Sequence, residues 1–179
     1  MPKTQDESSV DQLSFIPLTD KWVNLVWPFI EPEAHEMPKS WPKTKEELLS
    51  WALGTKKKQT IADRSLILRI EEDGDHLNPV GIITGDLVRG LNFSTFPGAK
   101  FGDVNIAYFV FSKFRGQGIA QKALTEVRQA WQDDRKNPVL RIAPENLVSQ
   151  AVANGAGFSY YKTVEANGRE FMIFKPQSL

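Results

Sequence analysis

The sequence predicts an α/β domain with a mixed sheet and the element order β-α-α-β-β-β-α-β-α-β-β. Two observations support this fold class. Apolar runs of strand length alternate with segments whose apolar residues recur every three or four positions. The two types of segment are interleaved along the chain, which is typical of helices covering a sheet. We expect a single domain over residues 12–179, preceded by a flexible polar tail at 1–11.

The first half of the chain contains a strand, two helices and a hairpin. Thr19 and Asp20 can cap the first helix, and prolines keep 31–44 irregular. The expected elements are a strand at 13–18, helices at 19–29 and 44–53, and strands at 65–70 and 80–87. The long connection at 88–102 has two open interpretations, one wall of a substrate site or a flexible insertion.

The second half continues the alternation. The expected elements are a strand at 103–111, a helix at 117–133, a strand at 138–142, a short helix from about 144 to 154, and strands at 158–164 and 170–174. Asn167 and Gly168 separate the last two strands, and this dipeptide favours a two-residue hairpin turn.

The turn between the 103–111 strand and the following helix carries the most chemical information. Gly116 and Gly118 lack a Cβ, so the backbone there can approach a ligand closely. Backbone N–H groups at a helix N-terminus have no intrahelical partner and favour anions, phosphate above all. Lys113 and Arg115 add positive charge. A tight turn without a ligand is the alternative interpretation.

The stretch from Arg115 to Ala120 fits the pattern Arg/Gln-x-x-Gly-x-Gly/Ala. It lacks the Lys-Ser/Thr pair of a P-loop and the third glycine of a dinucleotide-binding turn. It resembles the pyrophosphate-binding turn of the GNAT superfamily of acetyl-CoA-dependent N-acyltransferases. The spacing Asn146-x-x-Ser149-x-x-Val152, followed by Gly157-Phe158, is similar to the branch that acetylates ribosomal-protein N-termini.

This resemblance implies a GNAT-like fold, acetyl-CoA as cosubstrate and a set of site residues. Val110 would offer its backbone N–H to the thioester carbonyl, and Ser149 would contact the cofactor or protonate the sulfur. The backbone groups of Phe109, Val110 and Phe111 would face a gap in the sheet that takes the pantetheine arm. The implied cofactor-binding residues are Phe109, Val110, Phe111, Arg115, Gly116, Gln117, Gly118, Ile119, Ala120, Asn146 and Ser149.

The chain departs from this family at two positions. Ala153 stands where many members have a tyrosine acid, and Asn105 where many of that branch have a glutamate base. Asp103 is on the same strand face as Asn105 and could act through water. An α-amine, with a pKa of about 7.7–8.0, needs less help from a base than a lysine-like amine near 10.4. These departures favour a protein N-terminus or a small amine of low pKa.

The composition limits the other function classes. The 22 acidic and 22 basic residues cancel, which disfavours a nucleic-acid partner. The absence of cysteine excludes a cysteine nucleophile, and two separated histidines disfavour a metal site. No leader or membrane-spanning segment is expected, and we expect a cytoplasmic monomer or homodimer. The expected activity is N-acetylation of a primary amine by direct transfer in a ternary complex. A non-catalytic acyl-CoA-binding protein of the same fold is the alternative.

Overall fold

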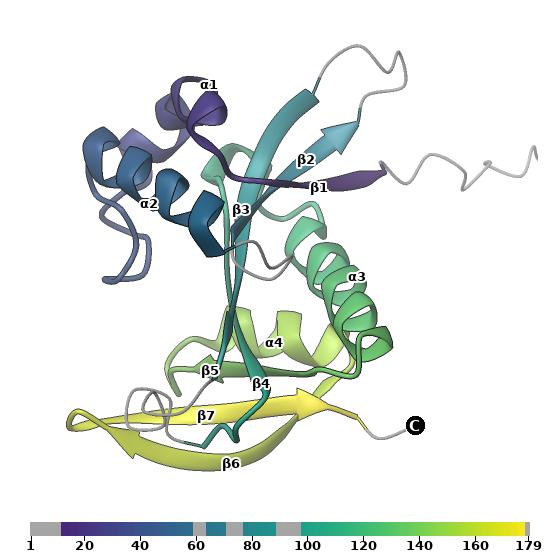
Figure 1. The fold of residues 1–179 in the computed structure, drawn as a ribbon. Coiled ribbons are helices and arrows are strands. Elements are labelled where there is room, and N and C mark those ends of the chain that lie inside the picture. The colour runs from purple at the N-terminus through teal and green to yellow at the C-terminus, as the bar shows by residue number, and fades with distance from the viewer. Residues whose placement is uncertain (1–11, 59–63, 71–76, 89–97, 178–179) are drawn as a thin grey trace, which may run out of the picture.

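The computed structural model describes residues 12–58, 64–70, 77–88 and 98–177 (Figure 1). The expected tail at 1–11 and residues 89–97 of the long connection lie outside the described residues. The strands are β1 (Leu13–Pro17), β2 (Arg64–Ile70), β3 (Leu77–Leu87), β4 (Asp103–Val110), β5 (Asn137–Ile142), β6 (Phe158–Ala166) and β7 (Arg169–Pro176). The helices are α1 (Asp20–Ile30), α2 (Lys45–Lys58), α3 (Ile119–Asp133) and α4 (Leu147–Gly155), with single 3-10 turns η1 (Glu31–Glu33) and η3 (Ser112–Phe114). This order confirms the predicted fold class.

The strands form one mixed sheet in the order β1-β2-β3-β4-β5-β7-β6. Neighbouring strands are antiparallel except for β4 and β5, which are parallel. The α3 helix makes the crossover that a parallel pair requires. The predicted hairpin turn between β6 and β7 is confirmed, because Asn167 and Gly168 both have positive φ, 52° and 70°.

Two hydrophobic cores lie on opposite faces of the sheet. Figure 1 shows α1 and α2 on one face and α3 and α4 on the other. Side chains alternate along β4, so Ile106 and Val110 pack beneath α3 and α4 while Phe109 and Phe111 pack toward α1 and α2. Burial on both faces explains why Ile106–Phe111 is apolar almost without interruption.

The β4 and β5 strands separate part of the way along. Their parallel pairing covers Asp103–Ile106 and Asn137–Leu140, and from Leu140 onward β5 pairs with β7 instead. The last residues of β4, from Ala107 to Val110, therefore pair with β3 on one side. On the other side is a gap, where no strand of the described residues pairs with them.

The connection between α1 and α2 is held by its own contacts. The Nζ of Lys43 donates to the carbonyl oxygens of Ala34 and Met37 at 2.5 and 2.8 Å. The indole of Trp41 is buried and lies 5.4 Å from the ring of Trp51. These contacts give the connection a defined position beside the end of β4, where it contributes to the site described next.

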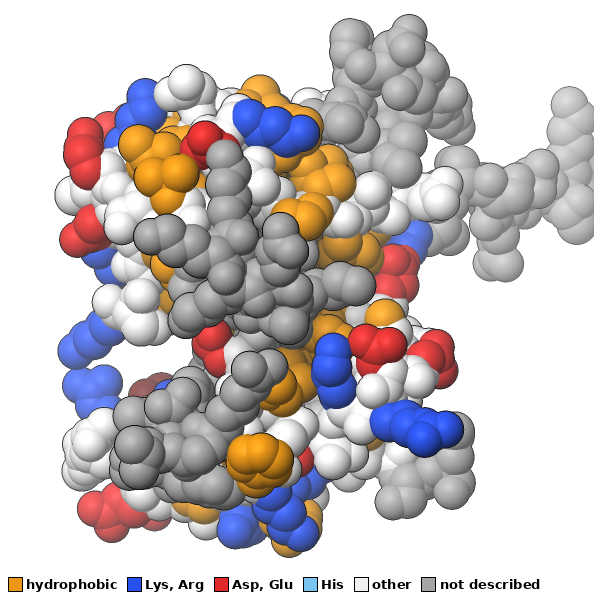
Figure 2. Space-filling view, in the orientation of Figure 1, with side chains coloured by type: hydrophobic (Ala, Val, Ile, Leu, Met, Phe, Trp, Pro, Cys, Tyr) orange, Lys and Arg blue, Asp and Glu red, His pale blue; other side chains and the backbone are white. Residues whose placement is uncertain are grey.

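Charged side chains of both signs are interspersed over the face that Figure 2 shows. This distribution agrees with the balanced composition of 22 acidic and 22 basic residues. Among the helices of the described residues, none is both long and apolar enough to cross a bilayer.

Candidate active site

A cavity of about 710 Å³ lies at the carboxyl ends of β4 and β5. Ligands of open α/β sheets bind at such a place, where the chain leaves neighbouring parallel strands in different directions. The N-termini of α3 and α4 both reach it, since Gly118 and Asn146 are their N-cap residues. Its lining residues are Glu36, Pro38, Tyr108, Phe109, Val110, Phe114, Arg115, Gly116, Gly118, Ile119, Ala120, Gln121, Asn146, Val148, Ser149 and Val152.

The turn that leads into α3 leaves its backbone open to the cavity. Gly116 and Gly118 have φ of 75° and 73°, in the region that favours glycine, and a Cβ on either would meet nothing within 4 Å. Gly118 is the N-cap of α3 and has no side chain to accept from the first-turn N–H groups. Those N–H groups and the positive end of the helix dipole therefore face the cavity.

Arg115 does not offer a free positive charge to this turn. Its guanidinium forms ion pairs with Glu33 and Glu36 at 2.9 and 2.8 Å, and its Nε donates to the carbonyl oxygen of Val110 at 3.0 Å. Glu33 also accepts from the N–H and the hydroxyl of Ser112 at 2.8 and 2.6 Å. Arg115 therefore links the turn to the connection between α1 and α2, and its charge is neutralised by carboxylates.

The other residues of the turn contribute backbone more than side chain. The amide oxygen of Gln117 accepts from Arg69 at 2.6 Å, and this residue is absent from the cavity wall. The side chain of Ile119 is buried in the core beneath α3, and Ala120 lines the cavity. An anion at this turn would thus meet N–H groups and small side chains.

The backbone of β4 corrects part of the expectation for residues 109–111. The N–H of Phe111 donates to the carbonyl oxygen of Val80 on β3 at 3.0 Å. Because residues in an antiparallel pair alternate between bonding the partner strand and pointing away from it, Phe109 also bonds β3. Val110 and Tyr108 then direct their N–H groups into the gap beside β4. Of the three residues expected to face this gap, Val110 alone does.

The start of α4 brings two further predicted residues to the cavity. Asn146 is the N-cap, and its Oδ1 accepts from the backbone N–H of Ser149 at 3.0 Å. This bond is an ordinary N-cap contact, and it leaves the amide NH₂ of Asn146 as a donor. Ser149 is half-buried on the cavity wall.

Asp103 and Asn105 lie at the other end of β4, and neither lines the cavity. At about 3.3 Å per residue, they are roughly 23 and 17 Å along the strand from Val110. Asp103 is buried, accepts from the N–H of Lys100 at 2.7 Å and lies 3.5 Å from the Nζ of Lys175. The expectation that Asp103 acts as a base through water is therefore wrong, because it is distant and already engaged.

Several residues of the cavity wall had not been predicted, and Glu36 and Tyr108 are the two with ionisable side chains. Glu36 comes from the connection between α1 and α2, 74 positions before Val110, and only the folded chain brings it here. Tyr108 comes from β4, and its burial raises the pKa of the phenol, while the nearby Ser149 side chain lowers it. Strand alternation could have placed Tyr108 on the same face as Ile106 and Val110.

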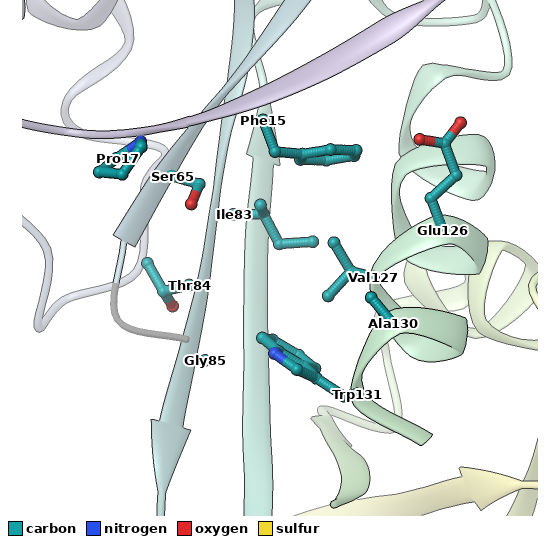
Figure 3. A pocket seen from close by; sticks show the side chains of 10 residues that line it. All are labelled: Phe15, Pro17, Ser65, Ile83, Thr84, Gly85, Glu126, Val127, Ala130 and Trp131. Atoms are coloured by element: carbon teal, nitrogen blue, oxygen red, sulfur yellow. The ribbon is translucent and has the colours of Figure 1, made fainter. Parts of the chain in front are cut away.

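A second cavity, of about 440 Å³, lies between β1–β3 and α3 (Figure 3). Phe15, Ile83 and Val127 point into it from three elements. Glu126 also lines it, and burial raises the pKa of this carboxyl while Lys122 lowers it. Its walls are mainly apolar side chains and include no helix N-terminus, so it lacks the anion-binding features of the first cavity.

The comparisons with known proteins agree with this geometry. Residues 13–159 match the sequence model of the family described as acetyltransferase (GNAT) domain. No curated protein sequence matches the chain significantly. Among solved structures, a protein from Bordetella pertussis described as a GnaT-family acetyltransferase superposes with a TM-score of 0.67 at 19% identity, covering 94% of this chain and 98% of that chain.

Two further structures show the same fold at low identity. The aminoglycoside acetyltransferase AAC(6')-Ib, in complex with paromomycin and acetyl-CoA, gives a TM-score of 0.71 at 12% identity, covering 93% of each chain. The ribosomal L7/L12 alpha-N-protein acetyltransferase RimL gives 0.67 at 14% identity, covering 93% of this chain and 90% of that chain.

Proposed function

The chain belongs to the acetyltransferase (GNAT) domain family, and we propose that it transfers an acetyl group from acetyl-CoA to a primary amine by direct attack in a ternary complex. One observation carries this proposal. Two helix N-termini and the stretch of β4 that pairs only with β3 converge on one cavity, where a glycine turn exposes backbone N–H groups. A long molecule with a phosphate-bearing part and an extended arm fits that arrangement.

The proposed cofactor position follows from these groups. The pyrophosphate of acetyl-CoA lies at residues 116–120, and its pantetheine arm extends along the gap beside Val110. Leu147 and Val148 at the start of α4 are 70% and 76% exposed, and Val148 lines the cavity. Covering apolar side chains that are this exposed is energetically favourable, so they support a ligand bound across the mouth of the cavity.

The chain's own groups would then assist transfer in three ways. Holding the two reactants together makes the attack effectively unimolecular. The N–H of Val110 stabilises the negative charge that develops on the carbonyl oxygen. The hydroxyl of Ser149 hydrogen-bonds the departing sulfur and gives it a proton, while the thiol pKa of about 8.5 makes the sulfur a good leaving group.

The acceptor would approach from the α1 and α2 face. The surface in Figure 2 is hollowed between the part over α1 and α2 and the part over β6 and β7. Glu33, Glu36 and Arg115 together carry two negative charges and one positive charge, which leaves one net negative charge at this side of the cavity. That charge favours a cationic amine, either a protein N-terminus or a small molecule. The cytoplasmic location and the monomeric or dimeric state stay predictions.

The activity is tested by adding acetyl-CoA and a panel of peptide N-termini and small amines, and by measuring free thiol. We expect thiol release that depends on the amine. Saturating acetyl-CoA, at about 100 times its dissociation constant, adds about 2.7 kcal/mol to stability and raises the melting temperature by roughly 5–10 °C. An unchanged melting temperature at millimolar acetyl-CoA would contradict cofactor binding. Binding without thiol release across the panel would contradict transfer.

Asn146 allows the helix cap to be separated from cofactor binding. Asn146→Ala removes the cap and should cost about 1 kcal/mol, which lowers the melting temperature by about 2–4 °C. Asn146→Asp keeps a cap acceptor, so we expect an unchanged melting temperature. It removes the amide donor and adds negative charge, and the affinity for acetyl-CoA measured by calorimetry should fall about tenfold. Wild-type affinity in Asn146→Asp would show that Asn146 is a cap alone.

A further inference from the structure

The hydroxyl of Tyr108 is a buried polar group for which the described residues provide no hydrogen-bond partner. Buried hydroxyls in folded proteins nearly always have a partner, because an unpaired one loses its hydrogen bonds to water without replacement. Buried side-chain atoms of Thr19 and Arg128 also lack a partner among the described residues, but both residues lie outside the active-site cavity. Tyr108 is the one of these residues that lines it.

Tyr108 and Ser149 line the same cavity. Burial raises the pKa of Tyr108, and the Ser149 side chain lowers it, which agrees with two hydroxyls that lie near one another. The pair does not complete a hydrogen bond in this structure. The raised pKa keeps the phenol protonated at neutral pH, so Tyr108 is a potential donor to Ser149.

The backbone around both residues fixes their positions. Tyr108 belongs to β4 where that strand pairs with Ile83 of β3, and its side chain packs against the core beneath α3 and α4. The N–H of Ser149 is held by the cap Asn146. Ser149 is half-buried, whereas the Tyr108 oxygen is inaccessible to solvent, so Ser149 is the member of the pair that a ligand can reach.

We propose that Tyr108 is a positioning residue that donates a hydrogen bond to Ser149 and resupplies the proton that Ser149 gives to the sulfur of coenzyme A. This inference rests on the proposed acetyl transfer. It assigns the supply of this proton to a residue of β4. The residue on α4 where the sequence resemblance implies a tyrosine acid is Ala153, whose side chain is buried and cannot donate a proton.

The proton movements balance as follows. The amine nitrogen forms a bond to the carbonyl carbon and loses one proton to water. The carbon–sulfur bond then breaks, and its electron pair goes to sulfur. The sulfur takes the proton of the Ser149 hydroxyl, Ser149 takes the proton of Tyr108, and the phenolate regains a proton that water delivers to it through Ser149. The net reaction converts a thioester and an amine into an amide and a thiol.

The test compares Tyr108→Phe with the wild type, using acetyl-CoA and its selenoester analogue. The substitution removes one oxygen atom that has no partner, so we expect an unchanged or raised melting temperature and an unchanged affinity for acetyl-CoA. Loss of proton supply should lower kcat with acetyl-CoA by roughly tenfold to a hundredfold. A selenol is a stronger acid than a thiol and leaves without a proton, so the selenoester should restore kcat of the variant to near the wild-type value.

Tyr161→Phe is the matched control, because Tyr161 is 53% exposed on β6 and outside the cavity. We expect it to behave as the wild type with both donors. A wild-type kcat in Tyr108→Phe would overturn the inference. A deficit that is equal with both donors would also overturn it, because it would show that Tyr108 only supports the shape of the site.

A second variant keeps the inference testable if Tyr108→Phe fails to fold. With 3-fluorotyrosine at position 108 the side chain keeps its shape and has a lower phenol pKa. In a plot of kcat against pH, the decrease at high pH should therefore move to lower pH. A decrease at the same pH as in the wild type would contradict proton transfer from Tyr108 to Ser149. If the wild type itself neither binds acetyl-CoA nor releases thiol, the proposed function fails first, and this result is distinct from a failure confined to the Tyr108 variants.

Discussion

Replacing Gly118 with glutamate is expected to abolish binding of acetyl-CoA. Gly118 is the N-cap of α3 at φ 73°, and a Cβ there would project into open space. The new carboxylate would lie where the phosphates are proposed to bind, and like charges in contact cost several kcal/mol. Since each 1.4 kcal/mol is a factor of ten, calorimetry should show an affinity at least about 100-fold weaker.

Gly168→Glu provides the matched control for this variant. Gly168 has φ 70° and open space at its Cβ position, but it lies in the turn between β6 and β7. A side chain in this backbone region costs roughly 1–3 kcal/mol at either glycine, so both variants should lose similar stability. The affinity of Gly168→Glu for acetyl-CoA should equal that of the wild type. Retained affinity in Gly118→Glu would mean that the pyrophosphate binds elsewhere.

Phe111→Ala should lower stability strongly without weakening acetyl-CoA binding to the folded protein. Phe111 is 1% exposed, its ring lies 5.6 Å from that of Phe29, and its N–H bonds Val80. Removing a buried phenyl group costs about 3–5 kcal/mol, which corresponds to a melting temperature lower by roughly 6–20 °C. Thermal melts measure the loss of stability, and calorimetry well below the melting temperature measures the affinity.

Phe101→Ala controls for the substitution itself. Phe101 is 69% exposed, so truncating it should change the free energy of unfolding by less than about 0.5 kcal/mol. If Phe111→Ala instead kept its stability and lost affinity, Phe111 would be the cofactor contact that the sequence resemblance implied. The two measurements therefore decide between a core residue and a binding residue.

The sequence was sufficient to predict every strand and helix that the structure describes, but not all of their ends. The α2 helix continues to Lys58, five residues beyond the expected end, through a lysine-rich stretch that has no apolar periodicity. Lysine is a good helix former, yet a stretch without apolar residues leaves no hydrophobic pattern in the sequence. The β3 strand begins at Leu77, ahead of Pro79, because the pairing with β2 is irregular at this point and a proline is tolerated there.

The structure brings the predicted residues to one cavity where the pattern is local, and it adds residues that come from distant parts of the chain. The glycine turn and the Asn146 cap are each contained in a few consecutive residues. The ion pairs of Arg115 with Glu33 and Glu36 join residues about eighty positions apart in the sequence, so no local sequence pattern could predict them. The direction of each backbone N–H group of β4 depends on the register between β4 and β3. A strand that is apolar at almost every position does not show which of two neighbouring residues bonds the partner strand.

The sheet is, in effect, two sheets joined by a short seam. The β1–β4 and β5–β7 portions meet through four residue pairs between β4 and β5, after which the strands diverge. A molecule lying in the divergence would touch both portions, and its binding free energy would add to the cohesion between them. The bound substrate would then act as a temporary brace, and exchange of amide hydrogens along the seam would slow whenever the enzyme is loaded.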